Sequence, residues 1–330
     1  MNQELQEKLT LFAANSQTMK REFKWREPLT IRMAALLFAF ENKPVDCSAI
    51  RECHALIKSN TGIFSTFRGN MVLCVAAMLS LKENREKLFA QTVAVYKMMK
   101  DVKFRASDYL AVAAYQIAAN TNSDNYQNIV VRTRAFYDGM KTNGFFRTGE
   151  DDYIFAAMLG LSDIDVKEGT NRIEQLYRQF KPDFLSGNSV QMLAQILVLA
   201  GKSDLVAERL FKLREELKNK KLRFDKSFTL SSLGILVLLP VDIDTIVQDI
   251  EEASTFLKTQ KGFSPLWVTK QERLLLTASI VASMYAENAK NDVLTASIST
   301  SITGIIIAQQ TAMIAAVTAS GAAASTASSS

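Results

Sequence analysis

The chain repeats a short, almost entirely apolar segment at intervals of about 40 residues, and this repetition limits its fold more than any other feature. Residues 110–118, Leu-Ala-Val-Ala-Ala-Tyr-Gln-Ile-Ala, show the pattern. A segment that is apolar on every face must be buried on every side. We therefore predict buried helices near residues 31–40, 72–81, 108–119, 151–162, 189–200, 228–239 and 272–285.

Composition decides between helix and strand for these segments. The chain has only 5 prolines and 13 glycines in 330 residues, which is too few for the many turns of an all-β fold. Alanine and methionine are frequent in the segments, and both residues favour helices. The sequence therefore predicts an all-α protein.

Amphipathic segments separate the apolar ones. At 245–258, Ile246, Ile250, Ala253 and Leu257 recur at helical spacing, and similar stripes occupy 128–141, 168–180 and 203–218. Tandem pairs of one buried and one amphipathic helix are typical of α/α toroids and of α-solenoids. Both alternatives remain open, because periodicity alone does not show whether the array closes. We expect one helical-repeat domain over residues 1–290.

An aromatic residue and a capping residue precede most of the apolar segments. The aromatic residues are Phe104, Phe145, Phe146, Phe184, Phe224 and Phe263, and the candidate caps are Ser107, Thr148, Asn188, Ser227 and Thr269. Side-chain oxygens of Ser, Thr and Asn satisfy free N–H groups in the first helical turn. An aromatic residue before such a cap seals the entry to the helix, so we interpret these phenylalanines as packing residues rather than ligand-stacking ones.

The C-terminal part of the chain has a different composition. No charged residue follows Asp292. We predict an apolar helix over 291–320 and a disordered low-complexity tail over 321–330. The helix is expected to dock on the repeats. Two alternatives are a contact between copies of the chain and membrane association through 293–319, although the many Ser, Thr and Gln residues make this stretch polar for a membrane span.

Charge and cysteine content restrict the partners and the compartment. The chain has 39 basic and 34 acidic residues, a formal charge of +5, which is not the one-sided charge of a nucleic-acid-binding protein. We interpret the densest basic stretch, which contains Lys218, Lys220, Lys221, Arg223 and Lys226, as a solvated turn, and the alternative is a patch that binds nucleic acid or an anionic membrane. Three cysteines do not form a disulfide framework, and the first residues lack the features of a signal peptide. A cytoplasmic protein is expected.

Acidic residues at the start of two buried segments form the most enzyme-like feature. Glu150, Asp151 and Asp152 open the fourth segment, and Asp108 has the equivalent place one repeat earlier. In a toroid they would face one mouth of the cavity, where Mg²⁺ held by Asp151 and Asp152 could bind a diphosphate. The alternative is that these acids offset the positive end of the helix dipole. No cofactor is expected unless the magnesium interpretation holds.

The remaining candidates are weaker. Arg32 and Arg68 lie at buried segments and could contact an anion, or else pair with neighbouring acids. Cys47, Cys53 and His54 are soft metal ligands, but their spacing is not that of a zinc site, and a fourth ligand would have to be the distant Cys74. No phosphate-binding glycine loop, dinucleotide fingerprint or nucleophile elbow is present.

Residues 146–159 read Phe-Arg-Thr-Gly-Glu-Asp-Asp-Tyr-Ile-Phe-Ala-Ala-Met-Leu, and an Ala/Ser-rich tail follows Gln309 and Gln310. With the helix-pair layout, these features resemble a bacterial family of unknown function, over most of the chain. The resemblance implies a mainly helical, cytosolic, bacterial protein, and it implies no activity and no catalytic residues.

Together these patterns predict a binding or scaffold module that holds a protein or a small molecule in a groove or central cavity. The alternative is an α/α-toroid enzyme that acts on a small or isoprenoid-like substrate through Asp108, Asp151 and Asp152. No nucleic-acid partner is expected, and the C-terminal helix could join copies of the chain.

Overall fold

Helices form the secondary structure in all parts of the chain that the computed structural model describes, which are residues 1–63, 65–142, 148–201, 206–226, 229–289, 304–310 and 312. No strand occurs within these residues, which confirms the all-α prediction. The chain divides into two compact units. Unit 1 contains residues 1–18, 38–44 and 171–309, and unit 2 contains residues 19–37, 45–170 and 310–330. The single domain over residues 1–290 stays a prediction.

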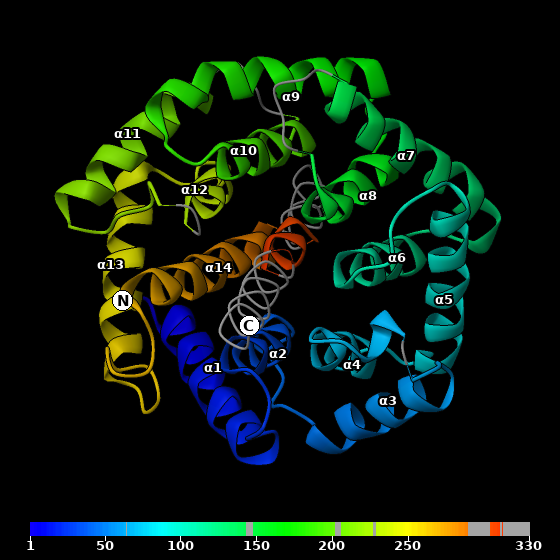
Figure 1. Ribbon diagram of the computed structural model, residues 1–330. Coiled ribbons are helices and arrows are strands. Elements are labelled where there is room, and N and C mark those ends of the chain that lie inside the picture. The colour runs from blue at the N-terminus through cyan, green and yellow to red at the C-terminus, as the bar shows by residue number, and fades with distance from the viewer. Residues whose placement is uncertain are drawn as a thin grey trace, which may run out of the picture. The chain divides into compact units, whose positions relative to one another are not determined.

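In unit 2, buried helices alternate along the chain with amphipathic ones. The buried helices are α4 (Val72–Ser80), α6 (Asp108–Asn120) and α8 (Tyr153–Leu161), and the amphipathic helices are α3 (Cys47–Ser59), α5 (Arg85–Asp101) and α7 (Tyr126–Thr142). Eight of the nine residues of α4 are buried, compared with four of the 17 in α5. Each amphipathic helix packs against the buried helix that follows it, so the two kinds form two layers (Figure 1).

The described residues also form short helices, and some of the longer helices have residues in both units. The short helices are η1 (Thr66–Arg68), η2 (Ser123–Asn125), η3 (Glu150–Asp152) and η4 (Lys181–Asp183). The helices α1 (Gln3–Glu22), α2 (Pro28–Phe40) and α9 (Val166–Phe180) have residues in both units.

Unit 1 repeats the same arrangement. Its buried helices are α10 (Gly187–Leu199), α12 (Leu230–Leu236) and α14 (Lys270–Ala289), and its amphipathic helices include α11 (Val206–Asn219) and α13 (Ile243–Thr259). The helix α12 packs against both α10 and α14, and α13 packs against α14. All seven residues of α12 are buried. All seven predicted apolar segments are therefore helical, although α12 is shorter and α14 longer than expected.

Some of the predicted caps are confirmed and others are wrong. The hydroxyl groups of Ser107 and Thr269 accept the backbone N–H three residues later, at 3.2 and 3.1 Å. At α10 the capping residue is Ser186 and not Asn188, which lies inside the helix. Thr148 lies one residue before the N-cap position of η3. Phe145, Phe146 and Ser227 lie outside the described residues.

Two arginines make the same contacts in different helix pairs. In unit 2, Arg132 on α7 donates hydrogen bonds of 2.8 to 3.1 Å to three carbonyl groups where α8 ends, 28, 30 and 32 residues later. In unit 1, Arg209 on α11 donates to three carbonyl groups where α12 ends, again 28, 30 and 32 residues later. The last carbonyl groups of a helix have no partner within it, so each guanidinium satisfies groups that the fold leaves open.

The N-terminal helix of unit 1 packs against the last helix pair of the same unit. The rings of Phe12 on α1 and Phe263 before α14 have centroids 5.3 Å apart, and both side chains are fully buried. Buried Lys8 pairs with Glu287 on α14 at 2.9 Å. The N-terminal amino group also pairs with Glu252 on α13. Lys8 and Phe12 of α1 are therefore part of the core of unit 1.

Close contact between α7 and α8 depends on Gly160. A Cβ atom there would lie 2.4 Å from Thr133 Oγ1 and 3.0 Å from the Thr133 backbone nitrogen. We expect Gly160→Ala to lower the free energy of unfolding by about 1 to 3 kcal/mol, the usual range for overpacking. Gly234→Ala is the matched control, because its new Cβ would meet only the end of the Leu193 side chain, which can move. Urea unfolding of both variants checks this, and equal losses would contradict it.

The described part of the C-terminal segment is helical and belongs to unit 1 except for its last residues. Ile305, Ile306 and Ala308 are buried, and the Gln309 amide donates hydrogen bonds of 2.8 Å to Ser231 and Ser232 on α12. Most of residues 291–330, including the predicted disordered tail, lies outside the described residues. Within the described part of the chain, no helix is long and apolar enough to cross a membrane.

Candidate functional site

The first acidic candidate, Asp108, lies at the first position of α6 in unit 2. Its carboxyl group packs against the turn before α4, where a Cβ atom on Gly69 would come within 2.4 Å of Oδ1. Burial raises the pKa of this carboxyl group, and a hydrogen bond from the backbone N–H of Asn70 partly offsets that effect. Asp108 is therefore a half-buried acid in a space that only glycine leaves open.

The two neighbouring aspartates of η3 have different roles. Asp152 is buried, and its Oδ2 accepts a hydrogen bond of 3.0 Å from the backbone N–H of Gly149, so it closes the start of η3. Asp151 is half-buried, and burial raises the pKa of its carboxyl group. The structure thus assigns a local structural role to Asp152 and leaves Asp151 as the better ligand candidate.

Tyr109 is the residue around which these acids gather. Burial raises its pKa, and four neighbouring carboxyl groups raise it further. They belong to Asp151, Glu150, Asp108 and Asp152, in order of decreasing effect. The helix α6 also packs against η3, so the structure brings the acids of two consecutive buried helices close together in unit 2. Sequence reasoning missed Tyr109, although it directly follows Asp108.

The two candidate arginines do not share this position. The Arg68 guanidinium donates to Thr61 Oγ1 at 3.2 Å and also to the carbonyl groups of Thr61 and Lys58, where α3 ends. Arg68 therefore closes the end of α3. Arg32 is half-buried within α2. Within the described residues, no lysine or arginine forms an ion pair with Asp108 or Asp151.

An aromatic cluster beside the acids was not predicted. The rings of Phe104, Tyr137 and Tyr153 have centroids 4.8 to 5.5 Å apart, and Arg134 lies over two of them. Burial, Tyr153 and Asp152 raise the pKa of Tyr137 to about 12. The three rings pack against one another, and Tyr153 directly follows η3. Phe104, Phe184, Phe224 and Phe263 are all buried, which confirms the packing interpretation of these residues.

The described residues contain no group of three His, Cys, Asp or Glu side chains that could hold a metal ion. Cys53 and Cys74 are buried free thiols, and burial raises the pKa of both. The His54 ring nitrogen lies 3.2 Å from the Arg26 guanidinium, so a cation rather than a metal site faces it. If Mg²⁺ binds here, Asp151 would be one of few protein ligands, and water or substrate phosphate would have to supply the others.

Neutralising the half-buried acids should stabilise the protein at neutral pH. Burial raises the pKa values of Asp108 and Asp151 in the folded state. At a pH above these pKa values the two carboxylates are charged and lower the stability of the folded state. This loss of stability disappears at a low pH, where the carboxyl groups are protonated in both the folded and the unfolded protein. We expect Asp108→Asn and Asp151→Asn to melt at higher temperature than the parent at pH 7, with a gain that fades as the pH falls to about 4. A lower melting temperature at pH 7 would contradict this.

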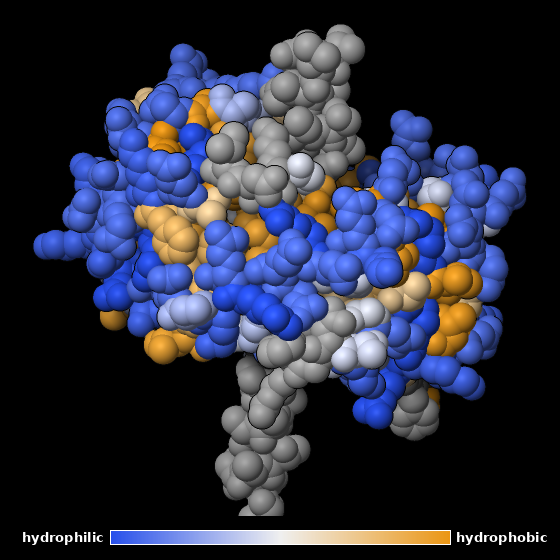
Figure 2. All heavy atoms as spheres, turned by 90° about the horizontal axis from the view of Figure 1, so that it is seen from above, coloured by the Kyte–Doolittle hydropathy of each residue, from blue (hydrophilic) through white to orange (hydrophobic). Residues whose placement is uncertain are grey.

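A second candidate site consists of apolar side chains that water reaches. Five large hydrophobic side chains with exposed fractions of 62 to 96% lie in the loops that lead into buried helices. They are Trp25 and Ile63 in unit 2, and Leu185, Leu266 and Trp267 in unit 1. On the face seen in Figure 2, hydrophilic side chains predominate and hydrophobic ones gather in separate patches. We take these side chains as candidate contact residues, because the free energy falls when a partner covers an apolar side chain that faces water.

Comparison with known proteins gives a family but no activity. A family model described as "Protein of unknown function (DUF4003)" matches residues 15–311. The "Uncharacterized protein YeaA" of Bacillus subtilis (strain 168) is 23% identical over 336 residues, which cover 99% of this chain and 98% of that protein. No solved structure matches the chain significantly. These matches confirm the resemblance to a bacterial family of unknown function.

Proposed function

The chain belongs to the DUF4003 family, and we propose that it acts as a binding module built from tandem helix pairs. The observation that carries this proposal is the position of the exposed apolar side chains. Five of them lie in loops before buried helices, whereas Val131 is the one exposed large hydrophobic residue found within a helix among the described residues. Random exposure would not select one class of loop.

The repeat architecture supports the same proposal. Arg132 and Arg209 make equivalent contacts in separate helix pairs, which is the behaviour of repeated units. In tandem helix pairs the connections into the buried helices follow one another along one edge. An α/α toroid and an open α-solenoid share this property, so within each unit the proposed contact residues lie on one edge whichever of them the chain forms.

Hydroxyl-radical footprinting tests the proposal without a known ligand. The purified protein and the same protein in intact bacterial cells are labelled and compared residue by residue. We expect protection in cells at one or more of Trp25, Leu185, Leu266 and Trp267, with Val131 as the internal control that labels equally in both. Equal labelling of all the loop residues in both samples would refute the proposal.

A second candidate function is catalysis at the acidic residues of unit 2. The observation that favours it is the gathering of half-buried Asp108 and Asp151 around Tyr109. Two carboxylates with magnesium would bind the diphosphate of a small or isoprenoid-like substrate. We rank this function second, because Asp152 already caps η3 and no cluster of three ligands exists within the described residues.

Thermal shift separates the two candidates. Inorganic pyrophosphate with and without Mg²⁺ is the probe, and the parent is compared with the Asp108→Asn and Asp151→Asn variants. The binding-module proposal predicts no magnesium-dependent increase in melting temperature. An increase that requires Mg²⁺ and is lost in both variants would replace it with the enzyme proposal.

We also propose a cytoplasmic location. The three cysteines are free in the structure, and two of them are buried, as is usual for proteins in a reducing compartment. Contact between copies of the chain through the C-terminal helix stays a second-rank proposal, since Gln309 already binds α12 in the same chain.

A further inference from the structure

Three loops of unit 1 lie at the starts of neighbouring buried helices. They lead into α10, α12 and α14, and we call residues 181–186, 219–226 and 260–270 the unit 1 loop edge. The three helices pack side by side, and each is joined to the next through an intervening helix, so their starts lie on the same side. Lys270 Nζ donates a hydrogen bond of 2.6 Å to the Lys221 carbonyl group, which joins the second loop to the third.

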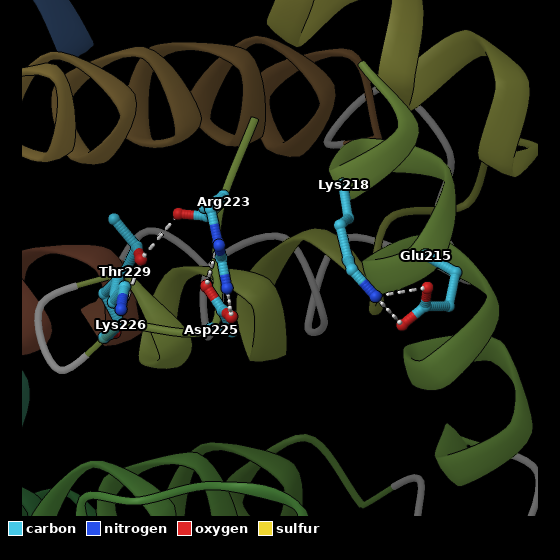
Figure 3. A network of polar contacts seen from close by, with 6 residues as sticks. All are labelled: Glu215, Lys218, Arg223, Asp225, Lys226 and Thr229. Atoms are coloured by element: carbon cyan, nitrogen blue, oxygen red, sulfur yellow. Dashed lines mark hydrogen bonds and ion pairs between the residues drawn. The ribbon is translucent and has the colours of Figure 1, made fainter. Parts of the chain in front are cut away.

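Two of the three loops carry an apolar tip that faces water, and buried neighbours hold each of these tips in place. Leu185 follows buried Phe184, whose ring stacks on Phe211. Leu266 and Trp267 lie between buried Phe263 and Val268. The middle loop is closed by Thr229, whose hydroxyl bonds the carbonyl groups of Arg223 and Lys226 (Figure 3). The tips are therefore fixed protrusions.

The unit 1 loop edge also concentrates positive charge. It contains six lysines and one arginine against two aspartates, and this excess of five equals the formal charge of the whole chain, +5. The rest of the chain is therefore balanced. The excess positive charge of the chain therefore lies on the same loop edge as the exposed side chains of Leu185, Leu266 and Trp267.

Only part of this charge is neutralised by neighbours. Arg223 pairs with Asp225 at 2.7 Å, and Lys218, just before the edge, pairs with Glu215 at 3.0 Å (Figure 3). Lys220 pairs with Glu251 on α13 at 2.8 Å. Within the described residues, no carboxylate forms an ion pair with the other five lysines of the edge, which are Lys181, Lys221, Lys226, Lys261 and Lys270. Five cations therefore remain available to an anionic partner.

We propose that the unit 1 loop edge docks on an anionic lipid surface, with Leu185, Leu266 and Trp267 entering the interface and the lysines facing phosphate groups. The proposal rests on the proposed binding function and names its partner. Leu185 lies on one loop and Leu266 and Trp267 on another. Separate apolar tips of this kind suit a soft surface, which admits each one singly, whereas a protein partner needs a matching pocket for each. Tryptophan prefers the membrane–water interface, and lysines are attracted to anionic headgroups.

Tryptophan fluorescence gives a direct test, because Trp25 and Trp267 are the only tryptophans in the chain. In Trp25→Phe the remaining indole reports on the unit 1 loop edge, and in Trp267→Phe it reports on unit 2. With vesicles of phosphatidylcholine containing phosphatidylglycerol, we expect Trp267 emission to shift to shorter wavelength and to be quenched by brominated lipid. Trp25 emission should not change, and vesicles of pure phosphatidylcholine should have no effect.

Sedimentation with the same vesicles tests the charge and the apolar tips separately. Partitioning should fall about fivefold in each of the variants Lys221→Gln, Lys226→Gln and Lys261→Gln. The matched control is Lys97→Gln, an exposed position on α5, which should partition like the parent. Leu185→Ser with Leu266→Ser should also lower it, with circular dichroism unchanged.

Two outcomes would overturn the lipid proposal: no binding to anionic vesicles, or binding that none of these variants weakens. If footprinting in cells still protects the loops, the binding function stands and the partner is an acidic protein rather than lipid. If the loops are unprotected as well, both proposals fail.

Discussion

Replacement of Phe12 with alanine is expected to lower the free energy of unfolding by about 3 to 5 kcal/mol, the usual cost of deleting a buried aromatic side chain. The side chain is fully buried, and its ring lies 5.3 Å from that of Phe263. The change opens a cavity where α1 packs against the last helix pair of unit 1. Urea unfolding followed by circular dichroism measures the loss as a lower midpoint.

Leu11→Ala is the matched control, because Leu11 lies next to Phe12 on the same helix but is only half-buried. It should cost much less than Phe12→Ala, since most of the removed surface already contacts water. Equal losses for the two variants, or no loss for either, would show that α1 does not contribute to the core of unit 1.

Arg209→Met and Arg132→Met should each lower the free energy of unfolding by about 2 to 4 kcal/mol, because each leaves three carbonyl groups without a charged donor. Similar losses are expected for the two variants, since both guanidinium groups contact carbonyls 28, 30 and 32 residues later. The lysine variants should recover less than half of the loss, because one ammonium group cannot span three acceptors. Melting temperatures compare all four proteins.

Arg178→Met controls for the loss of a surface arginine. Arg178 pairs with Glu174 on the exposed side of α9, and such pairs contribute little to stability. A loss in Arg178→Met as large as that in Arg209→Met, or full recovery in Arg209→Lys, would contradict the proposed role of the equivalent arginine contacts in the two helix pairs.

The buried helices could be predicted because an entirely apolar segment has few ways to avoid water. Periodicity located all seven, but their ends depend on local packing that apolar composition does not encode. Residues 237–239 are as apolar as α12, yet they form a turn before Pro240 and stay buried outside the helix. The sequence pattern did not predict α3, because Cys53 was considered only as a possible metal ligand. In the structure, Cys53 belongs to the buried stripe of α3 with Ile50 and Ile57.

Part of the candidate site could also be predicted. Equivalent places in consecutive repeats predict that Asp108 and Asp151 lie near each other, and both affect the pKa of Tyr109. The partners of Arg68 could not be predicted, because they are carbonyl groups that only the end of α3 presents. The unit 1 loop edge was missed for a similar reason, since its basic and apolar residues come from loops separated by whole helices.

Alternation of buried and amphipathic helices is the property from which the binding edge follows, and amide hydrogen exchange measured by mass spectrometry tests it most directly. Peptides from α4, α6, α8 and α10 should exchange more slowly than peptides from α3, α5, α7 and α11, because opening a buried helix exposes the most apolar surface. Faster exchange in the buried set than in the amphipathic set would contradict the paired arrangement.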